Sequence, residues 1–222
     1  MQDAKTSPSA AEPPDSPTAV ARKRPRPGER RVQILRALAG MLEQPGAERI
    51  TTAALAARLG VSEAALYRHF ASKAQMFEGL IEFIEQSVFT LLNQIADRAL
   101  PDAPVLLDLP AAWARPAGTM VAMVLQFAET NPGMTRVMVG DALVFENARL
   151  QQRMNQFFDK LEAMLRQTLR PALDGTDTPT HDAQVIASAL TAFLLGRLHR
   201  YARSGFRRLP SEHLGASLAV ML

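Results

Sequence analysis

The sequence predicts an all-α fold of about nine helices, and three observations support this prediction. From residue 30 onward, apolar side chains recur every three or four residues, which is the period of an amphipathic helix. No segment shows the two-residue alternation, bounded by turn residues, that indicates a half-buried strand. Apolar residues make up 47% of the 222-residue chain, which is enough for a large buried core. We therefore expect three N-terminal helices, then a helical bundle that dimerises, and no sheet.

Residues 1–28 are expected to form a disordered tail, because they contain six prolines and few large apolar side chains. The tail ends in four basic residues, Arg22, Lys23, Arg24 and Arg26. They would either attract a polyanion non-specifically or form an arm that reaches phosphates. Residues 22–73 hold eleven lysines and arginines against four glutamates, a net charge of +7, whereas residues 74–222 have a net charge of −2. This asymmetry favours a polyanion-binding head on a near-neutral body; a basic tail that only aids solubility is the alternative.

Composition argues against several classes of protein. The chain has no cysteine, which excludes disulfides, thiolate metal sites and cysteine nucleophiles. No apolar run approaches the roughly 18 residues of a membrane span, and the N-terminus lacks the apolar core of a signal peptide, so we expect a cytoplasmic protein. No glycine-rich phosphate loop occurs, and no metal-ligand spacing links the four histidines, His69, His181, His199 and His213. We therefore expect no metal, no cofactor and no catalytic activity.

Apolar stripes and capping residues predict the N-terminal elements in order. The expected helices cover residues 30–42, 51–59, 62–70 and 72–95. The Pro45-Gly46 pair should end the first helix, and Ser72 is placed to cap the fourth. Residues 29–73 would then form one domain, and residues 74–222 a second domain for dimerisation and partner binding.

Prolines and turn residues divide the remainder of the chain. Four prolines between residues 100 and 118 predict a long connection there, and Pro171 should stop a later helix. Residues 175–180 are expected to form a loop. The expected helices cover residues 119–129, 132–139, 143–169, 181–204 and 211–222.

Residues 51–70 have the pattern of a helix-turn-helix. Thr51 or Thr52 is placed to cap the first helix, Gly60 suits the sharp turn, and Ser62 caps the second helix. Leu66 and Phe70 lie four residues apart and should point into the core. The outward face of the second helix then carries Glu63, Ala64, Tyr67 and Arg68.

This outward face indicates a DNA-binding function, because the second helix of such a motif enters the major groove. We expect Arg68 to bind a guanine or a phosphate and Ala64 to touch a thymine methyl group. Tyr67 and His69 are placed for phosphates beside Lys73, at the positive end of the next helix. A purely structural helical hairpin is the alternative.

The stretch from Thr51 to Lys73 resembles the DNA-binding domain of TetR-type regulators. The resemblance rests on Leu-Gly-Val-Ser at 59–62, Leu-Tyr-Arg-His-Phe at 66–70 and Ser-Lys at 72–73. It implies a homodimer on a palindromic double-stranded DNA site. It also implies phosphate contacts from Thr51, Ser62, Tyr67, His69 and Lys73, with Thr52 a further DNA-binding residue. The base-facing positions that it implies are Glu63, Ala64, Ala65 and Arg68.

Segments of the body extend the resemblance to the nucleoid occlusion factors within that family. Among them are Asp-Ala-Leu-Val-Phe-Glu at 141–146 and Asn-Pro-Gly at 131–133, and the similarity covers most of residues 30–206. It implies that the DNA-bound protein antagonises polymers of the tubulin-like division protein FtsZ. It also implies a groove for the FtsZ tail, formed by Phe83, Glu129 and Asn131. Leu91 and Thr130 stand where arginines are expected, which should weaken the binding of an acidic tail.

Two further alternatives concern the body. A ligand-responsive TetR-type repressor would use the body as a sensor pocket for a small molecule. We expect a small-molecule ligand only under this alternative. Residues 190–198 would form the dimer seam, with Gly196 permitting a close approach; a core within one chain is the alternative. The seam residues are Leu190, Phe193, Leu194 and Leu198.

Overall fold

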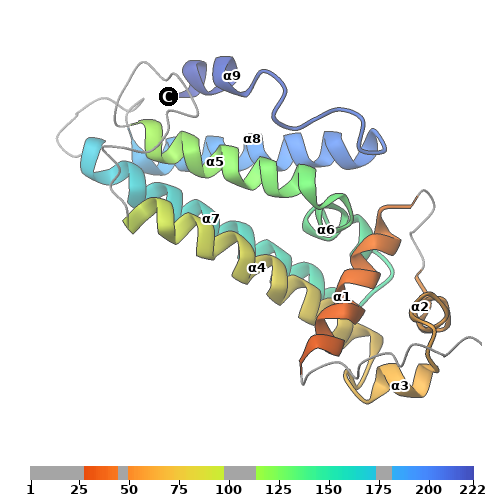
Figure 1. Cartoon of the computed structure of the whole chain (residues 1–222). Coiled ribbons are helices and arrows are strands. Elements are labelled where there is room, and N and C mark those ends of the chain that lie inside the picture. The colour runs from red at the N-terminus through yellow and green to blue at the C-terminus, as the bar shows by residue number, and fades with distance from the viewer. Residues whose placement is uncertain (1–27, 45–49, 98–113, 174–181) are drawn as a thin grey trace, which may run out of the picture.

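A computed structural model of the protein describes residues 28–44, 50–97, 114–173 and 182–222 (Figure 1). Within these ranges it contains nine α-helices, one short 3₁₀ turn and no strand. The predicted all-α class is therefore confirmed. Several predicted features lie outside the described residues: the tail, the Pro45-Gly46 pair, most of the connection at 100–118 and the loop at 175–180.

The first four helices follow the predicted order. They are α1 (Glu29–Leu42), α2 (Thr52–Leu59), α3 (Glu63–Tyr67) and α4 (Lys73–Asp97). Helices α1 to α3 cluster at one end of the molecule, and α4 runs from this head into the body (Figure 1). The apolar stripe of α4 is buried along its length, because Leu80, Ile84 and Leu92 are wholly inaccessible to solvent.

The body is built from long helices that lie side by side (Figure 1). Its elements are α5 (Ala114–Thr130), α6 (Pro132–Met138), the 3₁₀ turn η1 (Asp141–Leu143), α7 (Ala148–Leu173), α8 (Ala183–Arg203) and α9 (Leu214–Met221). Phe157 of α7 is wholly buried in this core, where its ring meets Phe89 and Phe158 edge to face at 5.4 and 5.0 Å between centroids. Edge-to-face pairs add to the stabilisation that burial of the rings provides.

Several helix boundaries differ from the prediction. Helix α5 begins at Ala114, so Pro116 lies in its first turn, where a missing N–H costs nothing because those groups have no partner within the helix. Residues 141–143 form the 3₁₀ turn η1, and α7 starts only at Ala148. Pro171 does not stop α7, which continues to Leu173. A proline near the end of a helix removes one hydrogen bond but keeps a helical φ.

The predicted dimer seam is wrong for three of its residues. Leu190, Leu194 and Leu198 are wholly buried within the protomer, so they belong to its own core. Phe193 is half-buried with the guanidinium of Arg197 4.8 Å from its ring centroid. Gly196 lies on the opposite, exposed face of α8, and a Cβ there would meet no atom within 4 Å. The face of α8 available to a partner therefore runs along Val185, Ala189, Ala192 and Gly196.

Head and body meet through α1 and α6. Gly133 is buried against α1 so closely that a Cβ at this position would lie 1.9 Å from the carbonyl oxygen of Ala39. Arg136 of α6 donates a hydrogen bond of 3.1 Å to the carbonyl of Gln44, just after α1. The head is therefore packed directly on the body, and its orientation depends on the residue at 133 having no side chain.

Candidate nucleic-acid interface

The two helices of the motif are capped as predicted. The hydroxyl of Thr51 accepts a hydrogen bond of 3.1 Å from the amide of Ala54, and that of Ser62 accepts one of 3.3 Å from Ala65. Gly60 ends α2 with a φ of 64°, in the left-handed region that favours glycine. Its neighbour Val61 donates back to the carbonyl of Ala56 at 3.0 Å. These bonds satisfy amide and carbonyl groups that helix ends leave free, and they fix the angle between α2 and α3.

The inner side of the motif is anchored on α1. Leu66 and Phe70 are both 1% exposed, as predicted. The guanidinium of Arg31 lies 4.2 Å from the centroid of the Phe70 ring, and it donates to the carbonyl of His69 at 3.2 Å. Helix α3 ends at Tyr67, earlier than predicted, and the contact with Arg31 holds the segment after it.

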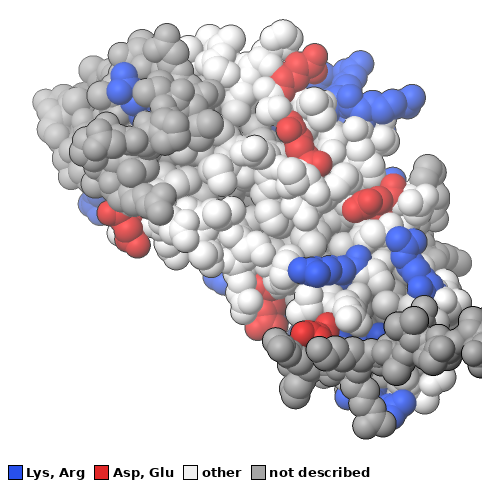
Figure 2. All heavy atoms as spheres, in the orientation of Figure 1, with Lys and Arg blue, Asp and Glu red and all other residues white. Residues whose placement is uncertain are grey.

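The outer side carries most of the predicted DNA-binding residues. Glu63, Ala64, Arg68 and His69 are exposed, and so is Tyr67, at 45%. Ala65 is half-buried and therefore less accessible than its neighbours Glu63 and Ala64. Figure 2 shows lysine and arginine side chains around this end of the molecule. The geometry thus brings the predicted residues of α3 onto one accessible face.

Three polar side chains on this face form a chain of hydrogen bonds between α2 and α3. The hydroxyl of Thr52 donates to the carboxylate of Glu63 at 2.5 Å, and the hydroxyl of Tyr67 donates to that of Thr52 at 3.4 Å. The carboxylate of Glu63 is therefore held against α2. Thr52 and Glu63 stabilise the pairing of the two helices, which the sequence pattern did not indicate.

Lys73 lies at the start of α4 and contacts the body. Ser72 caps this helix by accepting from the amide of Gln75 at 3.2 Å, as predicted. The ammonium of Lys73 forms an ion pair with Glu146, in the segment between η1 and α7, and the Glu146 side chain is only 12% exposed. Sequence reasoning missed this partner because it lies 73 residues away along the chain. A phosphate at Lys73 would have to share the ammonium with Glu146.

The three predicted groove residues have well-defined surroundings. Phe83 of α4 is half-buried and packs against the core. The carboxylate of Glu129 accepts from the amide of Ser211 at 2.9 Å, and its carbonyl accepts from the hydroxyl of Tyr201 at 3.3 Å. Burial, with smaller contributions from Glu129 and Glu43, raises the pKa of Tyr201, so this phenol stays protonated and donates. Glu129 therefore joins the end of α5 to α8 and to the segment before α9.

Asn131 precedes α6 but does not cap it through its side chain. Its side chain makes no hydrogen bond to the amides of α6. The amide group instead donates to the carbonyl of Phe127 at 2.8 Å and to the hydroxyl of Thr130 at 3.0 Å. Asn131 thus caps the C-terminal end of α5. Pro132 begins α6, and its lack of an N–H costs nothing because the first amides of a helix have no partner within the helix.

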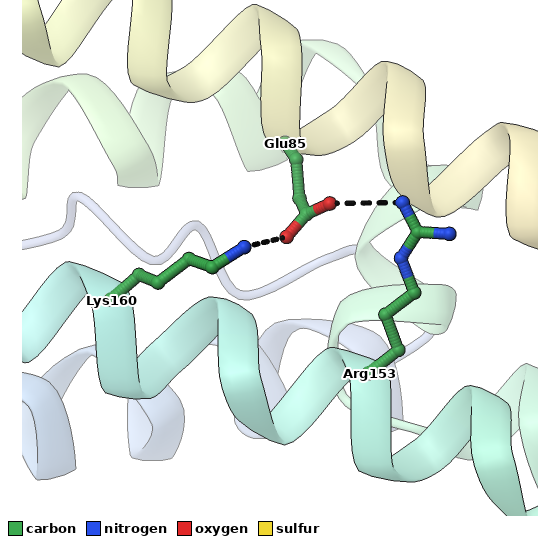
Figure 3. Close-up of polar contacts among 3 residues, drawn as sticks. All are labelled: Glu85, Arg153 and Lys160. Carbon is green, nitrogen blue, oxygen red and sulfur yellow. Dashed lines mark hydrogen bonds and ion pairs between the residues drawn. The ribbon is translucent and has the colours of Figure 1, made fainter.

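Glu85 of α4 lies largely buried at the contact with α7. Its carboxylate is 14% exposed and binds Arg153 at 3.2 Å and Lys160 at 3.0 Å, both on α7 (Figure 3). One carboxylate between two cations ties α4 to α7. The cations come from distant sequence, so the spacing of Glu82 and Glu85 alone gave no sign of the contact.

The fold and the capped motif define a TetR-type DNA-binding protein, and comparisons with known proteins agree. Residues 34–80 match the bacterial regulatory proteins of the tetR family, and residues 117–221 match an SlmA-like domain described as tetracyclin repressor-like, C-terminal. Solved structures show the same fold at low sequence identity. A fatty acid degradation regulator FadR from Bacillus halodurans aligns with a TM-score of 0.68, 14% identity, 87% of this chain and 95% of that chain.

Curated relatives are much more similar in sequence. The nucleoid occlusion factor SlmA of Photobacterium profundum is 50% identical over 187 residues, which is 83% of this chain and 89% of the relative. SlmA of Idiomarina loihiensis is 46% identical over 196 residues, 86% of this chain and 93% of the relative. The chain belongs to the SlmA family of TetR-type proteins. This membership supports DNA binding and dimerisation in general.

Within the described residues, none of the helices has the length and apolar character needed to cross a membrane.

Proposed function

We propose that this protein is a nucleoid occlusion factor. As a homodimer it binds palindromic DNA sites on the chromosome, and in the DNA-bound form it antagonises FtsZ polymers and division-ring assembly. Its location would be cytoplasmic and nucleoid-associated. The observation that carries the proposal is the 46–50% identity to SlmA proteins, which extends through the body as well as the head. A small-molecule sensor that shared only the head would diverge in the body.

The geometry of the head supports sequence-specific DNA binding. The exposed side of α3 presents Ala64 and Tyr67, and the exposed Arg68 and His69 follow the helix, before the start of α4. We infer that α3 enters the major groove, with Arg68 at base edges and Thr51, Ser62, Tyr67, His69 and Lys73 at phosphates. Thr52 and Glu63 would support this surface through their bond between α2 and α3.

The described face of α8 supports a twofold dimer. Val185 is 56% exposed, and the small residues Ala189, Ala192 and Gly196 continue the same face toward the end of the helix. Small side chains let two helices approach closely, and two recognition helices must lie about 34 Å apart to read a palindrome. We infer that this face of α8, together with α9, forms the dimer interface.

Binding of FtsZ is the part of the proposal that needs a direct experiment. The protein is immobilised and incubated with purified FtsZ, with and without a duplex that contains the operator. Retention of FtsZ that increases when operator DNA is present supports the proposal. No retention of FtsZ under either condition contradicts it, whatever the affinity for DNA.

A further inference from the structure

The C-terminal end of α8 carries a group of arginines that the DNA-binding face does not use. Arg200 and Arg203 lie in the last turn of α8, and Arg207 and Arg208 follow it. Together with Ser204 they line an open pocket of about 540 Å³. We call it the arginine pocket. Figure 2 shows basic side chains at the edge of the molecule near the place where α8 ends in Figure 1.

Most of the charge in this pocket is uncompensated. In the single protomer all four arginines are exposed, and within the described residues the guanidinium groups of Arg200, Arg203 and Arg208 make no hydrogen bond or ion pair. Only Arg207 is engaged, because its Nε donates to the carbonyl of Ser204 at 2.9 Å. One or two cations would suffice to complement the negative end of the helix dipole. Four of them around one hollow suggest an anionic ligand.

The backbone after α8 is held in a conformation that brings Arg207 and Arg208 back beside the helix end. Gly205 and Phe206 have φ values of 64° and 63°, and the second is unfavourable for a residue with a large side chain. The Phe206 ring is secured by Tyr201, at 5.2 Å between centroids, and by Arg136, whose guanidinium lies 5.0 Å from the ring centroid. Strained backbone conformations of this kind often occur at binding sites.

Ser204 fixes the rest of the turn. Its hydroxyl accepts from the amides of Arg207 and Arg208, at 3.0 and 2.9 Å. The pocket walls are therefore preorganised, and a ligand would need to order only the arginine side chains. Preorganisation of this kind lowers the entropic cost of binding.

We propose that the arginine pocket binds an acidic peptide segment through the carboxylates of its aspartate and glutamate side chains. A planar guanidinium fork matches a carboxylate in a bidentate way, and several forks around one hollow suit several carboxylates on a flexible chain. A DNA duplex is a poorer fit, because α8 ends well away from the recognition helix α3 (Figure 1). The proposal goes beyond the proposed function, because it requires neither FtsZ nor operator DNA.

The test measures binding of a fluorescent ten-residue glutamate peptide to the full-length protein by anisotropy, at low and at physiological salt. The Arg203→Gln/Arg208→Gln variant should bind about tenfold more weakly, as expected for the loss of two solvent-exposed charge contacts. The matched control, Arg149→Gln/Arg170→Gln, removes two exposed arginines of α7 and should bind within about twofold of the wild type. Arg203→Lys/Arg208→Lys should fall between the two, because lysine keeps the charge but loses the fork.

Several outcomes would overturn the proposal. One is that wild-type protein does not bind the peptide, and another is that all variants bind it equally. A third is that the Gln variant loses affinity for a DNA duplex or inorganic phosphate and not for the peptide. Light scattering on the same samples tests one more alternative, that a second copy of the chain occupies the pocket. If the Gln variant becomes monomeric, the pocket is filled by a second copy of the chain and not by a peptide.

Discussion

At the scale of single residues, we expect the head to use different side chains for base edges and for the phosphates of DNA. Arg68 is exposed on the outer side of the motif, and Lys73 stands at the start of the next helix. A base contact contributes to one sequence, whereas a phosphate contact contributes equally to all sequences. The two residues should therefore fail in different ways when they are truncated.

Arg68→Ala should lower the ratio of specific to random-site affinity. Lys73→Ala should weaken binding to all sequences alike and flatten the dependence of log affinity on log salt by about one unit. Fluorescence anisotropy with an operator duplex and a scrambled duplex measures both effects. An unchanged affinity ratio in both variants would show that the assigned orientation of α3 is wrong.

The ion pair between Lys73 and Glu146 leads to a second prediction at this scale. Glu146→Gln removes the charge that competes with phosphate for the ammonium, so affinity should rise for specific and random duplexes alike. The control is Asp159→Asn, which removes an exposed charge on α7. Its change in log affinity for DNA should be less than about half of that caused by Glu146→Gln, because a distant exposed charge is screened. Weaker DNA binding by Glu146→Gln than by the control would mean that Glu146 positions Lys73 and does not compete for it.

Sequence patterns predicted the local features of the site and missed the distant ones. The caps at Thr51, Ser62 and Ser72, the turn at Gly60 and the buried Leu66 and Phe70 depend on neighbours within a few residues, and a single sequence contains those. The pairs Lys73–Glu146 and Glu85–Arg153 join elements 73 and 68 residues apart. No spacing rule connects such residues before the fold is known.

At the scale of elements, helix identities were predictable and helix ends were less so. A stripe of apolar residues marks where a helix packs, but its last turn depends on which groups satisfy the free amides and carbonyls. Pro116 and Pro171 were both taken as interruptions, although each lies near a helix end, where the cost of proline is small. The seam residues of α8 were misassigned because the helix has two apolar faces, and the more apolar of them packs inside the protomer.

The contact between α1 and α6 gives the clearest prediction for an element. Gly133→Ala should force the two helices apart and destabilise the protein by about 1–3 kcal/mol, the usual cost of overpacking. Gly40→Ala is the matched control on α1, because its Cβ would meet only the flexible end of Arg58, at 3.2 Å. The control should be neutral or stabilising by up to about 1 kcal/mol. Urea unfolding measures both variants, and equal stability of the two would contradict this account of the junction.

At the scale of the whole molecule, the DNA-binding head lies at one end and α8 lies in the body (Figure 1), with one face of α8 exposed. Gly196→Arg should leave the protomer folded, because a Cβ there meets no neighbouring atom, yet it should block a close approach of two α8 helices. We expect light scattering to show a dimer for the wild type and a monomer for Gly196→Arg. The control, Gln94→Arg on the exposed face of α4, should remain dimeric.

Loss of the dimer should also weaken binding to a palindrome far more than binding to a single half-site, because two linked heads bind with high effective concentration. Circular dichroism provides the check on folding. If Gly196→Arg stays dimeric and keeps full affinity for the palindrome, the interface lies elsewhere on the molecule.

The central claim is that DNA occupancy enables this protein to antagonise FtsZ, and pelleting of FtsZ polymers tests it most directly. Purified FtsZ is polymerised with GTP in the presence of this protein, with operator DNA, with a scrambled duplex or with no DNA. We predict that the polymer pellet decreases with operator DNA and much less in the other two samples, because DNA favours one dimer conformation or gathers several dimers on neighbouring sites. An undiminished pellet at saturating protein and operator, together with a metabolite that releases the protein from DNA, would contradict the claim and establish a ligand-responsive repressor instead.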